Sequence, residues 1–138
     1  MAKRSGSYVV PFSFELLSFD EAVGLAADTG RISGDAGPLL ETVVDMLDEL
    51  GRPDEYFDCI QVAGTNGKYT SPQIVRYPER MEVDGRVVSD EAFARGVSAA
   101  VEAGRRVNAR RVAAGERAYT ITPFALLTAA ALVVFAEA

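Results

Sequence analysis

The feature that most constrains this sequence is an apolar run that leads into a glycine-rich loop, with only a short stretch of chain between that loop and Pro78. Residues 59–62 read Cys-Ile-Gln-Val, and residues 63–68 continue Ala-Gly-Thr-Asn-Gly-Lys. A short apolar run bounded by turn residues predicts a buried strand, here a central one. Only nine residues separate Lys68 from Pro78. Because a strand–helix–strand unit takes roughly 30 residues, none fits here, and we expect Tyr69–Pro78 to be extended or irregular.

The loop itself has the composition of a phosphate-binding loop. Glycines let the backbone turn its N–H groups toward an anion, and a lysine reaches the terminal phosphates. The same residues also fit an ordinary hairpin turn, because Asn-Gly is the commonest pair in a tight turn. Two features of the context favour the phosphate loop. The preceding run is apolar, as in a parallel sheet covered on both faces, and Pro72 and Pro78 interrupt any partner strand that would follow.

Helix signals precede the loop. Ser18-Phe-Asp-Glu21 is a capping box that predicts a short helix to about Ala27, and residues 28–37, with three glycines, predict a loop. Pro38 suits the first position of a second helix, which Gly51 ends. The predicted buried face of that helix consists of Leu39, Leu40, Val43, Val44, Leu47 and Leu50. The predicted solvated face consists of Glu41, Asp45, Asp48 and Glu49.

A hairpin and two further helices are predicted after the loop. Residues 80–83 and 86–88 flank Asp84-Gly85, a strong two-residue hairpin signal. Ser89 caps a helix that Gly115 ends, and Pro123 starts the last one. The apolar side of the first of these helices is formed by Phe93, Val97, Ala100, Val101 and Val107, and Gly96 and Gly104 predict weak points where it bends or breaks.

A basic cluster lies in the later part of that helix. It consists of Arg105, Arg106, Arg110 and Arg111. Runs of charge are usually solvated helical faces, which is the plainer interpretation. The sharper hypothesis is a contact with an anionic substrate.

Composition excludes several classes of function. The chain has 138 residues, the size of one domain. Its net charge of −6 argues against a nucleic-acid partner, because proteins that bind nucleic acids usually carry a basic face. It has no histidine, which removes Ser–His and Cys–His catalysis and His-ligated zinc. The single cysteine, Cys59, cannot form an internal disulfide; we expect a buried, inert thiol and a cytoplasmic protein.

No segment reads as a membrane span or a signal peptide. The apolar stretch near the N-terminus is short and is broken by Pro11 and Ser13. Residues 123–136 are apolar, but 14 residues fall below the roughly 18 that a span needs. We expect this stretch to be a buried core helix and the protein to have no membrane partner.

An ordered set of short segments carries a resemblance to a known family. Ile60–Lys68 is similar to the ATP loop of the Mur ligase superfamily, in its folylpolyglutamate synthase/dihydrofolate synthase branch. Further segments resemble that branch in the same order along the chain: Leu39–Pro53, Tyr69–Pro72, Glu79–Gly85, Ser89–Phe93 and Thr122–Ala129. The loop alone indicates the superfamily, and the ordered set indicates the branch.

The resemblance implies an α/β fold and ATP-dependent ligase chemistry. Residues 1–138 would form a single N-terminal, incomplete ATP-binding domain, a helix-rich part of a P-loop Mur-ligase-type ATPase domain with an incomplete central parallel sheet. ATP with Mg²⁺ would phosphorylate a carboxylate of folate or dihydropteroate, and the amine of glutamate would attack the acyl phosphate. By family match, nucleotide would bind to Gly64, Thr65, Asn66, Gly67 and Lys68, the folate or dihydropteroate to Thr70, Ser71 and Pro72, and magnesium to Ser71.

The sequence also departs from this family. There, glycine and a long helix follow the loop lysine, whereas Tyr69 follows Lys68 here. The sequence looks as if that helix and the next strand had been deleted, so we expect the chain alone to bind ATP weakly or not at all and to lack ligase turnover. Two alternatives stay open. One is a non-catalytic remnant or interaction module with a vestigial phosphate loop, and the other is a P-loop phosphotransferase, whose loop is usually longer.

Overall fold

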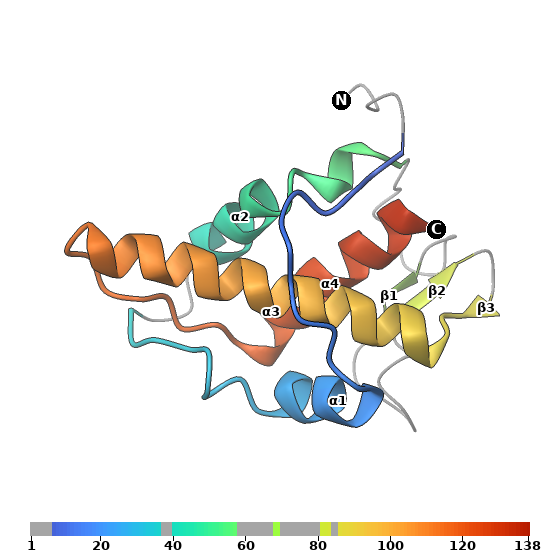
Figure 1. The fold of residues 1–138 in the computed structure, drawn as a ribbon, viewed down its shortest axis with the longest axis horizontal. Coiled ribbons are helices and arrows are strands. Elements are labelled where there is room, and N and C mark those ends of the chain that lie inside the picture. Colours follow the sequence, from blue (N-terminus) through green and yellow to red (C-terminus); the bar gives the residue numbers. More distant parts are fainter. Residues whose placement is uncertain (1–6, 37–39, 58–67, 70–80, 84–85) are drawn as a thin grey trace.

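The computed structural model describes residues 7–36, 40–57, 68–69, 81–83 and 86–138. The long helix α3 (Asp90–Ala113) runs along the molecule and packs against α4 (Pro123–Glu137). Figure 1 shows α1 (Phe19–Ala27) and α2 (Leu40–Glu49) on opposite sides of this pair. The strands gather near the beginning of α3 and the end of α4. The predicted helix-rich architecture is confirmed.

The N-terminal segment is extended and crosses α3 (Figure 1). Its side chains alternate, with Tyr8 and Val10 buried and Val9 73% exposed. The guanidinium of Arg106 lies 4.6 Å from the ring centre of Phe12, which fixes the segment to the helix. The predicted capping box then opens α1: the Ser18 hydroxyl accepts a hydrogen bond from the Glu21 amide, and the Glu21 carboxylate accepts one from the Ser18 amide.

Helix α2 forms as predicted, and its predicted buried face is confirmed only in part. Leu50 is fully buried as predicted, whereas Met46 and Thr42 are buried although neither was assigned to that face. Leu40 is 80% exposed and Val44 is 42% exposed, against expectation. The leucines and valines at helical spacing form a wide apolar stripe, and their pattern does not tell which edge of the stripe is buried. The position of α3 and α4 decides this.

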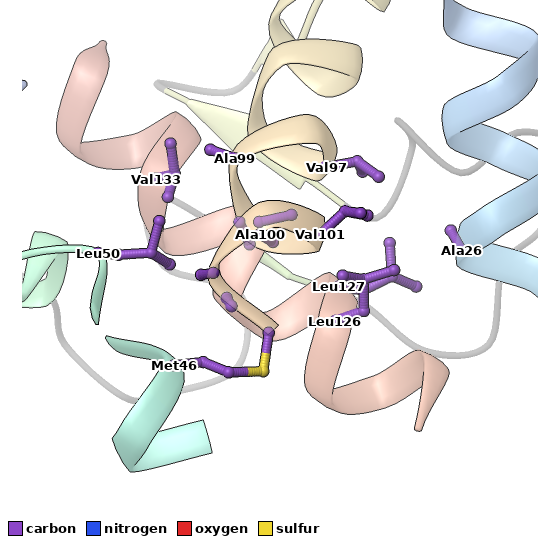
Figure 2. Packing of buried hydrophobic residues seen from close by; sticks show 14 of the residues in the cluster. Ala26, Met46, Leu50, Val97, Ala99, Ala100, Val101, Leu126, Leu127 and Val133 are labelled. Carbon is purple, nitrogen blue, oxygen red and sulfur yellow. The ribbon is translucent and has the colours of Figure 1, made fainter. Parts of the chain in front are cut away.

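The core lies between α3 and α4, with α1 and α2 closing it from either side. Figure 2 shows Val97, Ala100 and Val101 of α3 facing Leu126 and Leu127 of α4. Ala26 of α1 approaches from one side, and Met46 and Leu50 from the other. Leu126, Leu127 and Val133 are fully buried, so the apolar last helix is a core helix, as predicted.

The glycines of α3 do not break it, contrary to the weak points predicted from their helix propensity. A Cβ built on Gly96 would lie 2.6 Å from Val134 Cγ2 and 2.9 Å from the Ala130 carbonyl oxygen. A Cβ on Gly104 would lie 2.7 Å from Ile121 Cδ1. Glycine therefore lets neighbouring elements approach α3 closely, and the packing offsets its low helix propensity of about 1 kcal/mol.

Three short strands form one antiparallel sheet in the order β1 (Lys68–Tyr69), β2 (Met81–Val83), β3 (Arg86–Val87). The predicted hairpin is confirmed, because Val83 pairs with Arg86. Among the described strands no pair is parallel. The strand predicted at residues 59–62, on which the parallel sheet depended, lies outside the described residues.

Candidate functional site

Lys68 is the one described member of the predicted phosphate-binding and substrate-binding set. Gly64, Thr65, Asn66 and Gly67 lie outside the described residues, as do Thr70, Ser71 and Pro72. Lys68 begins β1, and its register partner on β2 is Glu82. A phosphate-binding loop normally leads from its lysine into a helix, whose first amides and dipole face the phosphates. The backbone of Lys68 and Tyr69 is instead that of a strand.

The prediction that Pro72 and Pro78 exclude a partner strand after Lys68 is wrong. Strand β1 pairs with β2 over Lys68–Glu82 and Tyr69–Met81. The partner comes from beyond both prolines, because the β2–β3 hairpin is itself a strong local unit that offers an edge. Tyr69 is extended as predicted, and the segment 70–80 is not described.

The basic cluster of α3 is used mainly inside the molecule. Arg106 and Arg110 both form ion pairs with Glu49 of α2, whose side chain is only 12% exposed. Arg106 Nε also donates a hydrogen bond to Glu102 Oε2, one turn earlier, at 3.2 Å. The anion that meets these two arginines is thus a carboxylate of this chain. Glu49 was predicted to be solvated; it instead joins α2 to α3.

Arg111 stabilises the turn after α3. Its guanidinium lies 3.9 Å from the ring centre of Tyr119 and donates a hydrogen bond to the Arg117 carbonyl oxygen. The Tyr119 hydroxyl donates to Asp45 Oδ2 at 2.6 Å, which raises the pKa of this phenol. Asp45 is therefore also not part of a purely solvated face. Asn108 completes this region by accepting from the Tyr119 amide and donating to its carbonyl oxygen.

An open cleft of about 840 Å³ lies beside β3. Its walls include Tyr8 and Tyr56, whose ring centres lie 5.2 Å apart. The Tyr8 hydroxyl donates to the Leu50 carbonyl oxygen, and burial, followed by the charge of Glu137, raises the pKa of Tyr8. Arg95 donates to both carboxylate oxygens of Glu137. The side chains of Tyr8, Arg95 and Glu137 in this cleft thus already have hydrogen-bond partners within the chain.

Within the described ranges, no three or more Cys, His, Asp or Glu side chains are grouped so as to hold a metal ion. Ser71, the expected magnesium ligand, lies outside these ranges. No helix that the structure describes is long and apolar enough to cross a bilayer.

Comparison with known proteins gives three related sequences. The chain is 28% identical to a probable dihydrofolate synthetase of Schizosaccharomyces pombe, over 70% of this chain and 25% of that protein. It is 32% identical to a probable bifunctional folylpolyglutamate synthase/dihydropteroate synthase of Haloferax volcanii, over 88% of this chain and 16% of that protein. It is 30% identical to a dihydrofolate synthase/folylpolyglutamate synthase of Bacillus subtilis, over 46% of this chain and 20% of that protein.

The chain therefore spans a quarter or less of the length of these curated relatives. Each alignment is also longer than the part of this chain that it covers: for the Haloferax protein, 88% of 138 residues is about 121, against 142 aligned positions. The other two alignments exceed the covered residues by a similar margin. No family model and no solved structure matches. The three matches show that the chain is similar to a part of proteins of the folylpolyglutamate synthase/dihydrofolate synthase family.

Proposed function

We propose that this chain is a folylpolyglutamate synthase/dihydrofolate synthase-type scaffold that, on its own, binds Mg-ATP weakly and does not turn over as a ligase. The names of the three relatives support the folate-ligase family. The alternative function, a working ligase, would join glutamate to a folate or dihydropteroate carboxylate through an acyl phosphate. The two functions differ in how tightly the loop before Lys68 binds the phosphates of ATP.

The observation that carries the proposal is the strand at Lys68–Tyr69. In a phosphate loop the charge of the helix dipole acts within the first turn, and here that turn is replaced by pairing with β2. Tyr69 also puts a bulky residue where the family keeps glycine next to the phosphates. The described residues thus do not fit the usual ATP cradle, and no catalytic step is derived through ATP or Mg²⁺.

The length of the alignments supports the same conclusion. The relatives hold about 20 more positions than this chain within the matched stretch. A deletion of the loop helix and part of the next strand would have about that size, since a strand–helix–strand unit takes roughly 30 residues. What nucleotide affinity the chain retains we assign to Gly64, Thr65, Asn66, Gly67 and Lys68, and any folate contact to Thr70, Ser71 and Pro72, with Ser71 nearest the metal.

The test is calorimetric titration of the purified chain with Mg-ATP, followed by an assay for ADP in the presence of folate or dihydropteroate and glutamate. We expect no saturable binding in the micromolar range and no glutamate-dependent ADP release. Each 1.4 kcal/mol lost corresponds to about tenfold in affinity, so loss of the helix and of the adjacent glycine together is sufficient for this outcome.

Two variants make the result decisive. Lys68→Ala removes the loop cation, and Arg86→Ala removes an exposed cation of the same sheet as a matched control. Tight Mg-ATP binding that Lys68→Ala abolishes and Arg86→Ala preserves would overturn the proposal. Glutamate-dependent release of ADP by the chain would establish the working ligase instead.

A further inference from the structure

The arginines on the two sides of α3 are not equivalent. Arg106, Arg110 and Arg111 contact Glu49, Glu116 or the ring of Tyr119. Arg105, on the other side of the helix, has no hydrogen bond or ion pair within the part of the chain that the structure describes. The same holds for Arg31, in the loop after α1.

These two exposed arginines border one open hollow of about 570 Å³. The hollow lies against α3, residues 31–33 and Ala118. The stretches that hold these residues are joined beside α3 by backbone hydrogen bonds from Gly34 to Tyr119 and from Ala36 to Ala118. Its surface is mostly apolar and includes Ile32, Ala109, Val112, Ala113 and Ala118. Val112 is 62% exposed. No carboxylate is among its described lining residues, so neither guanidinium group meets a carboxylate within this hollow.

Acidic residues do lie on the other side of the two arginines. Glu15, Glu21 and Asp28 line a second hollow, of about 340 Å³, that Arg31 and Arg105 also border. The Glu21 carboxylate accepts a hydrogen bond from the Ser18 amide in the capping box of α1, and Asp28 Oδ1 accepts one from the Gly30 amide. Arg31 contributes, after the bonds from Ser18, to lowering the pKa of Glu21. The arginines therefore separate an acidic hollow from an apolar one.

We propose that the Arg31/Arg105 surface, formed by these two residues with Val112 and Ala113, docks an acidic amphipathic helix of a partner protein. Carboxylates of that helix would meet the planar guanidinium groups, which suit bidentate pairing. Its apolar side chains would cover Val112 and Ala113. The open shape favours a peptide over a small ligand, because small-molecule sites enclose most of the ligand surface. The partner is defined by charge complementarity, since two arginines and no carboxylate border the apolar hollow.

The experiment uses two synthetic amphipathic helical peptides with the same apolar face, one with glutamate and one with glutamine along its polar face. Binding to the full chain is measured by fluorescence anisotropy at low and high salt. We expect the glutamate peptide to bind, more weakly as salt rises, and the glutamine peptide to bind far less. Arg31→Ala and Arg105→Ala should each weaken binding up to about fivefold, and the double variant about 20-fold, since exposed ion pairs are worth up to about 1 kcal/mol.

Arg86→Ala is the matched control, because Arg86 is exposed and belongs to β3, which lies near the beginning of α3 (Figure 1), whereas Val112 and Ala113 lie at its end. It should leave binding unchanged, and circular dichroism should show the same helix content for all variants. Equal binding of both peptides, binding of neither, or an unchanged affinity in the double variant would overturn the proposal. None of these outcomes depends on whether the chain binds ATP.

Discussion

The α3–α4 pair and the β1–β3 sheet differ in what holds them in place. Phe93, Val97 and Leu126 of the helix pair are fully buried, whereas both residues of β3 are exposed. The helices pack against each other along their length, while the strands pair over only two residues at each ladder. We expect such a helical scaffold to keep its core when the segment next to the strands is shortened, because few of the buried core residues described come from the strands.

The largest test of this comparison replaces one residue in each region. Phe93→Ala removes a fully buried ring, and we expect a loss of about 3–5 kcal/mol in the free energy of unfolding. Val87→Ala in β3, where the side chain is 50% exposed, should change it by less than about 0.5 kcal/mol. Urea unfolding followed by circular dichroism measures both. A loss of similar size in the two variants would mean that the sheet carries the core after all.

A second test sharpens the account of the helix pair. Gly96→Ala places a methyl group against Val134 and the Ala130 carbonyl, and we expect a loss of about 1–3 kcal/mol from overpacking. Gly24→Ala in α1 meets no atom within 4 Å and should stabilise the chain by about 0.5–1 kcal/mol. Thermal or urea unfolding of the two variants gives the sign of each change. If Gly96→Ala also stabilises, α3 and α4 do not approach as closely as described.

A third test concerns the boundary between the sheet and α3. The Ser89 hydroxyl accepts a hydrogen bond from the Ala92 amide and starts the helix directly after β3. Ser89→Ala should cost about 1 kcal/mol. Ser13→Ala, at an exposed position of the N-terminal segment, should change the free energy of unfolding by less than about 0.5 kcal/mol. No difference between the two variants in urea would show that the cap contributes nothing to the scaffold.

The smallest effect is expected in pH dependence and lies at alkaline pH. The hydrogen bond to Asp45 raises the pKa of Tyr119, and burial raises that of Tyr8. The unfolded chain releases these protons near pH 10, before the folded chain does. Stability is therefore fully present below about pH 10 and falls as pH rises above it. Urea unfolding from pH 8 to 11 should show this slope, and Tyr8→Phe with Tyr119→Phe should flatten it.

Local signals predicted the helices well. The capping box at Ser18, the cap at Ser89, the helix start at Pro123 and the Asp84-Gly85 hairpin signal each act within a few residues, so the surrounding fold adds little to them. The buried face of α2 was partly wrong, because which edge of an apolar stripe is covered depends on the elements that pack there. The internal contacts of Glu49 and Asp45 were not predicted for the same reason, since their partners Arg110 and Tyr119 are distant in sequence.

The sequence by itself determined the helix boundaries, the hairpin and the kinship with folate ligases, because these rest on short patterns and on their order along the chain. The tertiary structure alone decided that Gly96 serves close packing, that most of the basic cluster pairs internally and that Lys68 lies in a strand. Each of these depends on contacts between segments far apart in the chain. Such contacts leave no local pattern, because the partner residue and not the residue itself sets the energy of the interaction.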